Sequence, residues 1–150
     1  MERLAPPSGK RVLVVGAGPS GLSAAYHLAR LGHDVVVRDN GPQAGGMMRY
    51  GIPAYRLPRD VLDRELEKLA EWGVTFETGW RLGDGANTLD ALAERFDLVF
   101  LGVGCHSPKA IRVPGEDAKG IVHAVDWLRA LELGSRPDLA GQRIVIVGGG

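Results

Sequence analysis

The sequence predicts an α/β fold built on a doubly wound parallel β-sheet, and three observations indicate it. Runs of consecutive apolar residues alternate along the chain with segments of helical periodicity. These runs are apolar at nearly every position, which is typical of parallel strands covered on both faces. A glycine cluster directly follows the first run and precedes the first helical segment, as expected for the turn between a strand and its crossover helix.

The predicted elements follow in order from these patterns. The strands are the short apolar runs, which lie at 12–15, 34–38, 75–78 and 98–101, the last expected to be buried like the first. The helices have apolar positions three and four residues apart, at 19–31, 59–72, 88–95 and 124–133. Segments rich in glycine, proline or polar residues are expected to be loops, at 40–58, 113–120 and 134–141.

Composition limits the classes of function. The 150 residues suffice for one domain with a core, and 18 basic residues balance 18 acidic ones. We therefore expect neither a nucleic-acid nor an anionic-membrane partner. The single cysteine, Cys105, excludes an internal disulfide and an iron–sulfur or zinc cluster built by this chain alone. The apolar runs are far shorter than a membrane span and no secretion signal is visible, so we expect a cytoplasmic protein.

A repeat indicates two nucleotide-binding folds in series. GKRVLVVGAG at 9–18 and GQRIVIVGGG at 141–150 are identical or conservatively replaced at every position except for the Lys/Gln and Ala/Gly exchanges. We predict a flexible N-terminus at 1–8, a first domain at 9–134, and a hinge with the start of a second domain at 135–150. The chain is then expected to be the N-terminal piece of a longer enzyme. The alternative is a short protein that finishes on a buried strand with a glycine tail.

The glycine cluster matches the dinucleotide-binding pattern G-x-G-x-x-G. Gly16 permits a tight turn after the strand, Gly18 lets the backbone approach a pyrophosphate, and Gly21 lets the helix pack close to the sheet. The N-terminus of that helix, with Pro19 and Ser20 in its first turn, offers N–H groups and a positive dipole end to phosphates. A Rossmann-like dinucleotide site is therefore predicted here.

The end of the second predicted strand carries two charged residues with different implications. Asp39 stands at the position where a carboxylate accepts hydrogen bonds from the ribose of the bound dinucleotide. The alternative is that the adjacent Arg38 binds the 2′-phosphate of a phosphorylated dinucleotide. We favour the carboxylate because it occupies the end of the strand.

Four further motifs resemble one family of flavoproteins. The chain is similar over residues 9–150 to the small (beta) subunit of glutamate synthase and its relatives, which include the FAD segment of dihydropyrimidine dehydrogenase and, more distantly, adrenodoxin reductase. The motifs are GPQAGGMMRYGIP at 41–53, YRLPRDVLDREL at 55–66, FDLVFLGVG at 96–104 and VPGEDAKGI at 113–121. The sequence departs from the family in three places. Asp39 stands where glutamate is commoner, Arg38 where an aromatic residue is usual, and Cys105-His106 where the segment is generally small and bland.

The resemblance implies FAD on the first fold, with Gly45 and Gly46 against the cofactor and Arg49 near the flavin or its phosphates. Arg49 could supply a fixed positive charge to a phosphate or to a reduced flavin, and the alternative is a solvated loop cation. For Trp80 two interpretations stay open: its main chain meets the adenine, or its indole belongs to the core. The predicted cofactor-binding residues are Gly16, Gly18, Pro19, Ser20, Gly21, Asp39, Gly45, Gly46, Arg49, Trp80, Gly104, Gly148 and Gly150. No catalytic residue and no metal ligand is predicted.

The resemblance also implies an activity. NADPH or NADH would dock on the second fold and pass a hydride to FAD, and electrons would leave to an iron–sulfur subunit or domain like the glutamate synthase large subunit. The 150 residues alone are expected to bind FAD weakly and not to oxidise NADPH. Two alternatives remain: an NAD-dependent dehydrogenase, and a non-catalytic adenylate-binding module completed by a partner chain.

Overall fold

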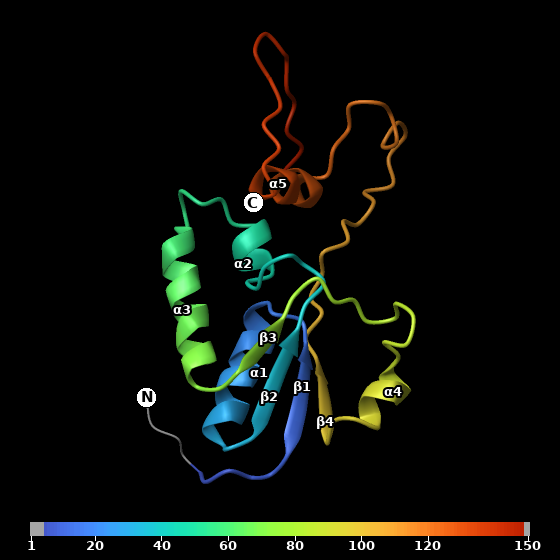
Figure 1. Ribbon diagram of the computed structural model, residues 1–150. Coiled ribbons are helices and arrows are strands. Elements are labelled where there is room, and N and C mark those ends of the chain that lie inside the picture. Colours follow the sequence, from blue (N-terminus) through green and yellow to red (C-terminus); the bar gives the residue numbers. More distant parts are fainter. Residues whose placement is uncertain (1–4, 149–150) are drawn as a thin grey trace.

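The computed structural model describes residues 5–148 and contains one parallel sheet with helices on both faces (Figure 1). The four strands are paired in the order β3-β2-β1-β4. Their bounds are β1 Arg11–Val15, β2 Asp34–Arg38, β3 Thr75–Glu77 and β4 Leu98–Leu101. The helices are α1 Pro19–Arg30, α2 Met47–Tyr50, α3 Arg59–Glu71, α4 Leu89–Ala93 and α5 Ala124–Glu132. The predicted α/β class with a doubly wound parallel sheet is confirmed.

The strand order places β1 at the centre of the topology. The chain runs outward from β1 to β2 and β3, and then returns to add β4 on the other side of β1. In the register of the sheet, Val15 lies opposite Arg38 on β2 and Leu101 on β4. The carboxyl ends of the strands therefore meet at one edge, and the connections leaving that edge diverge between β1 and β4.

Two apolar clusters cover the two faces of the sheet. On one face, valines of β1 and β2 pack against α1 and α3; this cluster contains Val14, Val35, Val37, Leu22, Ala25, Ala29 and Leu66. On the other face, the alternate strand residues pack against α4 and the segment after it; this cluster contains Leu13, Val15, Val36, Leu92 and Phe96. Burial on both faces explains why β1 and β2 are apolar at nearly every position.

The observed elements differ from the predicted ones in two respects. The loop predicted at 40–58 contains the short helix α2, which begins after Gly46. The strand predicted to be buried at 98–101 is instead the edge of the sheet, and Leu98 and Leu101 are about half exposed, at 50% and 51%. An edge strand has a neighbour on one side only, which an apolar run does not reveal.

The second copy of the repeat forms no strand among the described residues. Val145, Ile146 and Val147 are 87%, 82% and 85% exposed. A single strand has no partner groups for its backbone, so it is stable only when paired. The start of a second domain at 135–150 therefore stays a prediction.

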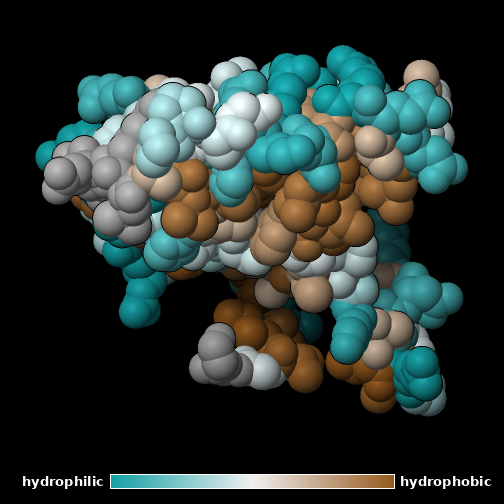
Figure 2. Space-filling model, turned by 90° about the horizontal axis from the view of Figure 1, so that it is seen from below, coloured by the Kyte–Doolittle hydropathy of each residue, from teal (hydrophilic) through white to brown (hydrophobic). Residues whose placement is uncertain are grey.

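Figure 2 shows hydrophobic surface both on the main body of the molecule and on a smaller lobe.

Glycine is required where the first turn joins the sheet. Gly16 has φ of +107°, and a Cβ on it would lie 2.2 Å from the carbonyl oxygen of Gly102. A Cβ on Gly21 would lie 1.8 Å from the carbonyl oxygen of Gly16. The predicted roles of these two glycines in the tight turn and in close helix packing are thus supported by the backbone geometry.

In the described part of the chain, no helix combines the length and apolar character that crossing a membrane requires.

We predict that Gly21→Ala destabilises the fold and that Gly18→Ala does not. The new methyl group at 21 displaces backbone, at a cost of about 3 kcal/mol. Gly18 has φ of −83°, and its nearest contact for a Cβ is 3.8 Å away, so its substitution should cost less than about 1 kcal/mol. Urea unfolding followed by circular dichroism measures both, and equal losses of stability would contradict the packing described.

Candidate functional site

A cavity of about 450 Å³ lies at the carboxyl ends of the strands. Its volume falls within the range of small-molecule sites, roughly 300–1,000 Å³. Residues that follow each of the four strands line it, together with two residues of α5. The lining residues are Val15, Gly16, Arg38, Asp39, Asn40, Trp80, Arg81, Leu82, Val103, His106, Ser107, Asp126 and Arg129. It therefore occupies the place where open α/β sheets bind their ligands.

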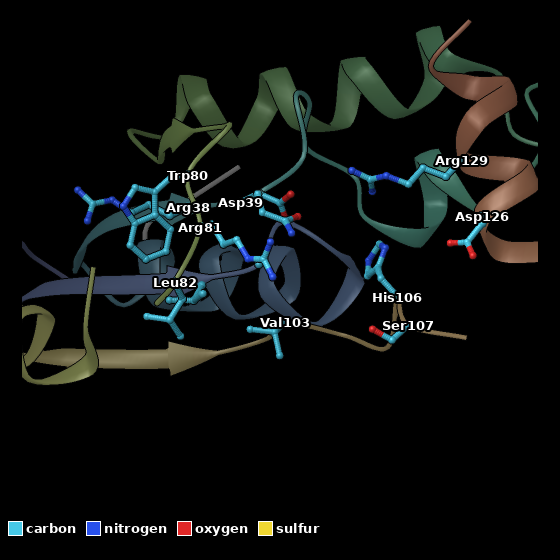
Figure 3. A pocket seen from close by; sticks show the side chains of 13 residues that line it. Arg38, Asp39, Trp80, Arg81, Leu82, Val103, His106, Ser107, Asp126 and Arg129 are labelled. Atoms are coloured by element: carbon cyan, nitrogen blue, oxygen red, sulfur yellow. The ribbon is translucent and has the colours of Figure 1, made fainter. Parts of the chain in front are cut away.

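The cavity has two ends of different chemistry. Figure 3 shows Arg38, Trp80 and Arg81 together at one end, and His106 and Arg129 at the other, with Asp39 between them. Three arginines and two aspartates line the cavity in all. This mixture of cationic and hydrogen-bonding groups with an aromatic ring suits a ligand that carries both phosphates and a flat base.

The carboxylate of Asp39 fixes the glycine turn. One oxygen accepts a hydrogen bond of 2.7 Å from the amide of Ala17, and the other accepts one of 2.7 Å from the amide of Gly41. Each carboxylate oxygen has a second lone pair, so Asp39 is still able to accept hydrogen bonds from a hydroxyl group in the cavity. The geometry agrees with Asp39 as the ribose acceptor, which stays a prediction.

Arg38 is held inside the protein. Its side chain is 10% exposed, and its Nε donates to Glu77 over 2.6 Å. Its guanidinium lies 5.1 Å from the centre of the Trp80 ring and 5.6 Å from that of Phe96. Glu77 balances the charge of Arg38 and the aromatic rings cover its guanidinium, while Arg38 also lines the cavity. The choice between Asp39 as a ribose acceptor and Arg38 as the mark of a 2′-phosphate site stays a prediction.

The indole of Trp80 is partly buried against the core, as one of its two interpretations expects, and contact of its main chain with an adenine stays a prediction. Its indole packs against the apolar cluster of β1 and α4, and it also lines the cavity. Its backbone amide donates to the carbonyl of Asp39 over 2.9 Å. The ring thus belongs to the edge of the core and forms one wall of the cavity, next to the Asp39 backbone.

The N-terminus of α1 lies directly after the turn that lines the cavity. Pro19 is the first residue of α1, and no side chain caps the helix at Gly18. The first helical N–H groups, which begin at Ser20, have no acceptor within the helix. Gly18, Pro19, Ser20 and Gly21 are not among the residues that line the cavity, so binding of a pyrophosphate by these N–H groups stays a prediction.

Gly45 and Gly46 are packed against the glycine turn. The amide of Gly45 donates to the carbonyl of Ala17 over 2.9 Å. Gly46 has φ of +51°, and a Cβ on it would lie 2.6 Å from the Cα of Gly18. The turn at 16–18 and the loop at 45–46 are therefore in backbone contact, although they are distant in the sequence. Both were predicted to contact the same cofactor.

Arg49 is buried, which the sequence did not indicate. Its exposed fraction is 3%, its Nε donates to the carbonyl of Ala44 over 2.7 Å, and it forms an ion pair with Asp63 on α3. It is absent from the residues that line the cavity. Its observed role is to brace the loop before α2 against α3, and a contact with the cofactor stays a prediction.

The last predicted glycines are placed differently from one another. Gly104 follows β4 with φ of +69°, beside His106 of the cavity wall. Gly148 has φ of +100° and no atom within 4 Å of a Cβ position. Gly150 lies outside the described residues. Gly104 therefore lies next to the cavity without lining it, and its contact with a cofactor, like that of Gly148, stays a prediction.

Several lining residues were not predicted as site residues. Asp126 and Arg129 come from α5, and His106 and Ser107 come from the segment after β4. The helical pattern at 124–133 predicts a helix but does not indicate that the helix lies over the sheet. Cys105 next to His106 is exposed. Residues 5–148 hold no group of three or more histidine, cysteine or acidic residues arranged for a metal ion.

Comparison with known proteins supports the interpretation of the motifs. A family model described as pyridine nucleotide-disulphide oxidoreductase matches residues 10–150. The NADP(+)-dependent formate dehydrogenase subunit beta of Moorella thermoacetica is 44% identical over 151 residues, covering 99% of this chain and 21% of that protein. The glutamate synthase [NADPH] small chain of Bacillus subtilis is 34% identical over 152 residues, covering 95% of this chain and 31% of that protein.

A solved structure is similar as well. Mycobacterium tuberculosis FprA in complex with NADPH aligns with a TM-score of 0.73 at 28% identity, covering 84% of this chain and 29% of that one. The chain thus spans about a fifth to a third of the length of the proteins it matches. The resemblance to the glutamate synthase small subunit, drawn from the loop motifs, is confirmed.

We predict that Asp39→Ala loosens the glycine turn. Hydrogen bonds to a charged acceptor contribute about 1.5–3 kcal/mol, so exchange of the Ala17 and Gly41 amides should accelerate by about tenfold or more. Hydrogen exchange followed by NMR measures this. Asp126→Ala is the control, because that aspartate also lines the cavity but sits on α5. Unchanged exchange in Asp39→Ala would show that the turn holds itself without the carboxylate.

Proposed function

Because the chain belongs to the pyridine nucleotide-disulphide oxidoreductase family, we propose that it binds FAD in the cavity at the carboxyl ends of its strands. The observation that carries this proposal is the position of Asp39, which lines the cavity while it holds the turn at Ala17 and Gly41. The site fits the ADP half of a dinucleotide: a carboxylate for the ribose, an uncapped helix N-terminus for the pyrophosphate, and an aromatic wall.

The residues divide the work of binding. Asp39 accepts hydrogen bonds from the ribose hydroxyls, and Trp80 offers its ring to the base. The N–H groups at the start of α1 bind the pyrophosphate, and Arg129 adds a positive charge at the opposite wall of the cavity. FAD, when bound, supplies the capacity to accept a hydride and to release electrons.

The enzyme to which these residues belong would take a hydride from NADPH or NADH. The glycine motif at 141–150 repeats the first one and is the part of this chain that would begin the nicotinamide site. Similarity to a protein named for NADP(+) and to one named for NADPH favours the phosphorylated nucleotide.

We propose that the electrons pass to an iron–sulfur partner subunit or domain. The chain has one cysteine, so it does not itself supply the set of thiolates that such a cluster requires. Two relatives are named as a subunit or a small chain, which supports assembly with a further component. A cytoplasmic location stays a prediction.

The rival function with the strongest support is an NAD-dependent dehydrogenase. NAD and FAD share the ADP half, and the residues at the ribose and pyrophosphate positions serve either. The loop at 41–53 favours FAD, because its sequence resembles the flavin-binding loop of the glutamate synthase small subunit, to which the chain is 34% identical.

We predict that FAD binds and that NADP⁺ does not compete for the same site, since Asp39 repels a 2′-phosphate. Isothermal titration of the chain with FAD, NAD⁺ and NADP⁺ measures the order of affinities. Asp39→Ala should weaken FAD by about tenfold, the loss of one or two charge-assisted hydrogen bonds, whereas Asp60→Ala on the exposed side of α3 should not. Tight binding of NAD⁺ without binding of FAD would instead indicate an NAD-dependent dehydrogenase.

A further inference from the structure

Helix α5 lies over the carboxyl end of the sheet although it contributes nothing to the core. Figure 1 shows it beside α2, above the strand ends. None of its residues is fully buried. Yet Asp126 and Arg129 on this helix form one wall of the cavity. The apolar residues Trp127, Leu128 and Leu131 of α5 are only half-buried, and polar contacts add to what holds the helix there.

Arg59, the first residue of α3, makes one of these polar contacts. Its Nε and one terminal nitrogen each donate to a different oxygen of Glu132, the last residue of α5, over 2.8 Å. The side chains of both residues are 19% exposed. A bidentate arginine–carboxylate pair fixes direction as well as distance, so it orients α5 in addition to attaching it.

The same guanidinium also gathers the loop between α2 and α3. It donates to backbone carbonyl oxygens over 2.6–3.3 Å, those of Met48, Arg49, Ile52 and Leu57. One side chain therefore joins the end of α5, the end of α2 and the start of α3. The planar fork of arginine has five N–H donors, which these six acceptors share.

Helix stability does not explain an arginine at this position. The start of a helix carries positive partial charge, and a cation in the first turn is unfavourable there. Pro58 precedes Arg59, and no side chain caps α3. The contacts with Glu132 and the four carbonyls compensate for this unfavourable position. The hydrogen bond from Arg59, together with the charges of Arg59, Arg49 and Arg136, holds the pKa of Glu132 below its usual value.

A second contact on the same side sets the direction of Arg129. Its guanidinium lies 4.7 Å from the centre of the Tyr50 ring. Tyr50 is 3% exposed, and its hydroxyl accepts from the amide of Gln43 and donates to the carbonyl of the same residue. A rigid ring thus supports one face of the guanidinium that borders the cavity.

We propose that Arg59 is a positioning residue, which clamps α5 over the cavity through Glu132 so that Arg129 is presented to the diphosphate of the dinucleotide. The part that concerns the ligand rests on the proposed function; the clamp itself does not. Loss of the clamp lets α5 leave the cavity, and Arg129 then no longer contributes to binding.

Hydrogen exchange of the chain without ligand tests the clamp. Arg59→Gln and Glu132→Gln should each raise the exchange rate of the α5 amides about tenfold or more, with no change for β1 and β2. Glu132→Gln leaves the carbonyl contacts of Arg59 in place, so it tests the clamp even where Arg59→Gln unfolds. Lys68→Gln is the control, because it removes a positive charge from α3 at an exposed pair with Glu65. Unchanged exchange in Glu132→Gln overturns the proposal.

A double-mutant cycle on FAD affinity tests the positioning role. Arg59→Gln and Arg129→Gln should each weaken FAD about tenfold, and the double variant should be no weaker than either one. Arg59→Lys, which keeps the charge and loses the fork, should recover less than half of the loss. Additive effects overturn the link from Arg59 to Arg129. If the unaltered chain binds no FAD, the proposed function fails, and α5 exchange alone decides the clamp.

Discussion

The hydrogen bonds between the Asp39 carboxylate and the amides of Ala17 and Gly41 are the interaction on which the site depends. They connect the end of β2 to the turn after β1 and to the loop that follows. The backbone of Gly46 packs against Gly18 in the turn after β1. One carboxylate therefore sets the spacing of three backbone segments around the cavity, and its remaining lone pairs are able to accept further hydrogen bonds. Removal of this group changes both the shape and the charge of the site.

The fold was predictable because strands buried on both faces have a strong sequence signal. Val12–Val15 and Val35–Val37 are apolar throughout since α1 and α3 cover one side and α4 covers the other. The edge position of β4 was not predictable, because exposure depends on which strands stand beside it. Likewise, the exposed 143–147 segment shows that an apolar pattern alone does not make a strand where no partner strand lies beside it.

The site was predictable where it depends on backbone conformation and not where it depends on tertiary contacts. The turn at Gly16 and Gly21 has the required close approaches, which only glycine permits. Arg49 was expected near the cofactor, but its pairing with Asp63 depends on how α3 packs. Arg129 gave no local signal, since its place in the cavity follows from a contact between Glu132 and Arg59, 73 residues away in the sequence.

The central claim is that the cavity binds the ADP half of a flavin dinucleotide. NMR titration of the amide-labelled chain with FAD, ADP and FMN tests it most directly, because FMN carries the flavin without the adenosine. FAD and ADP are expected to shift the amides of Ala17, Gly18 and Gly41, and FMN is expected to leave them unchanged. Shifts confined to other segments, or equal shifts with FMN, would contradict it.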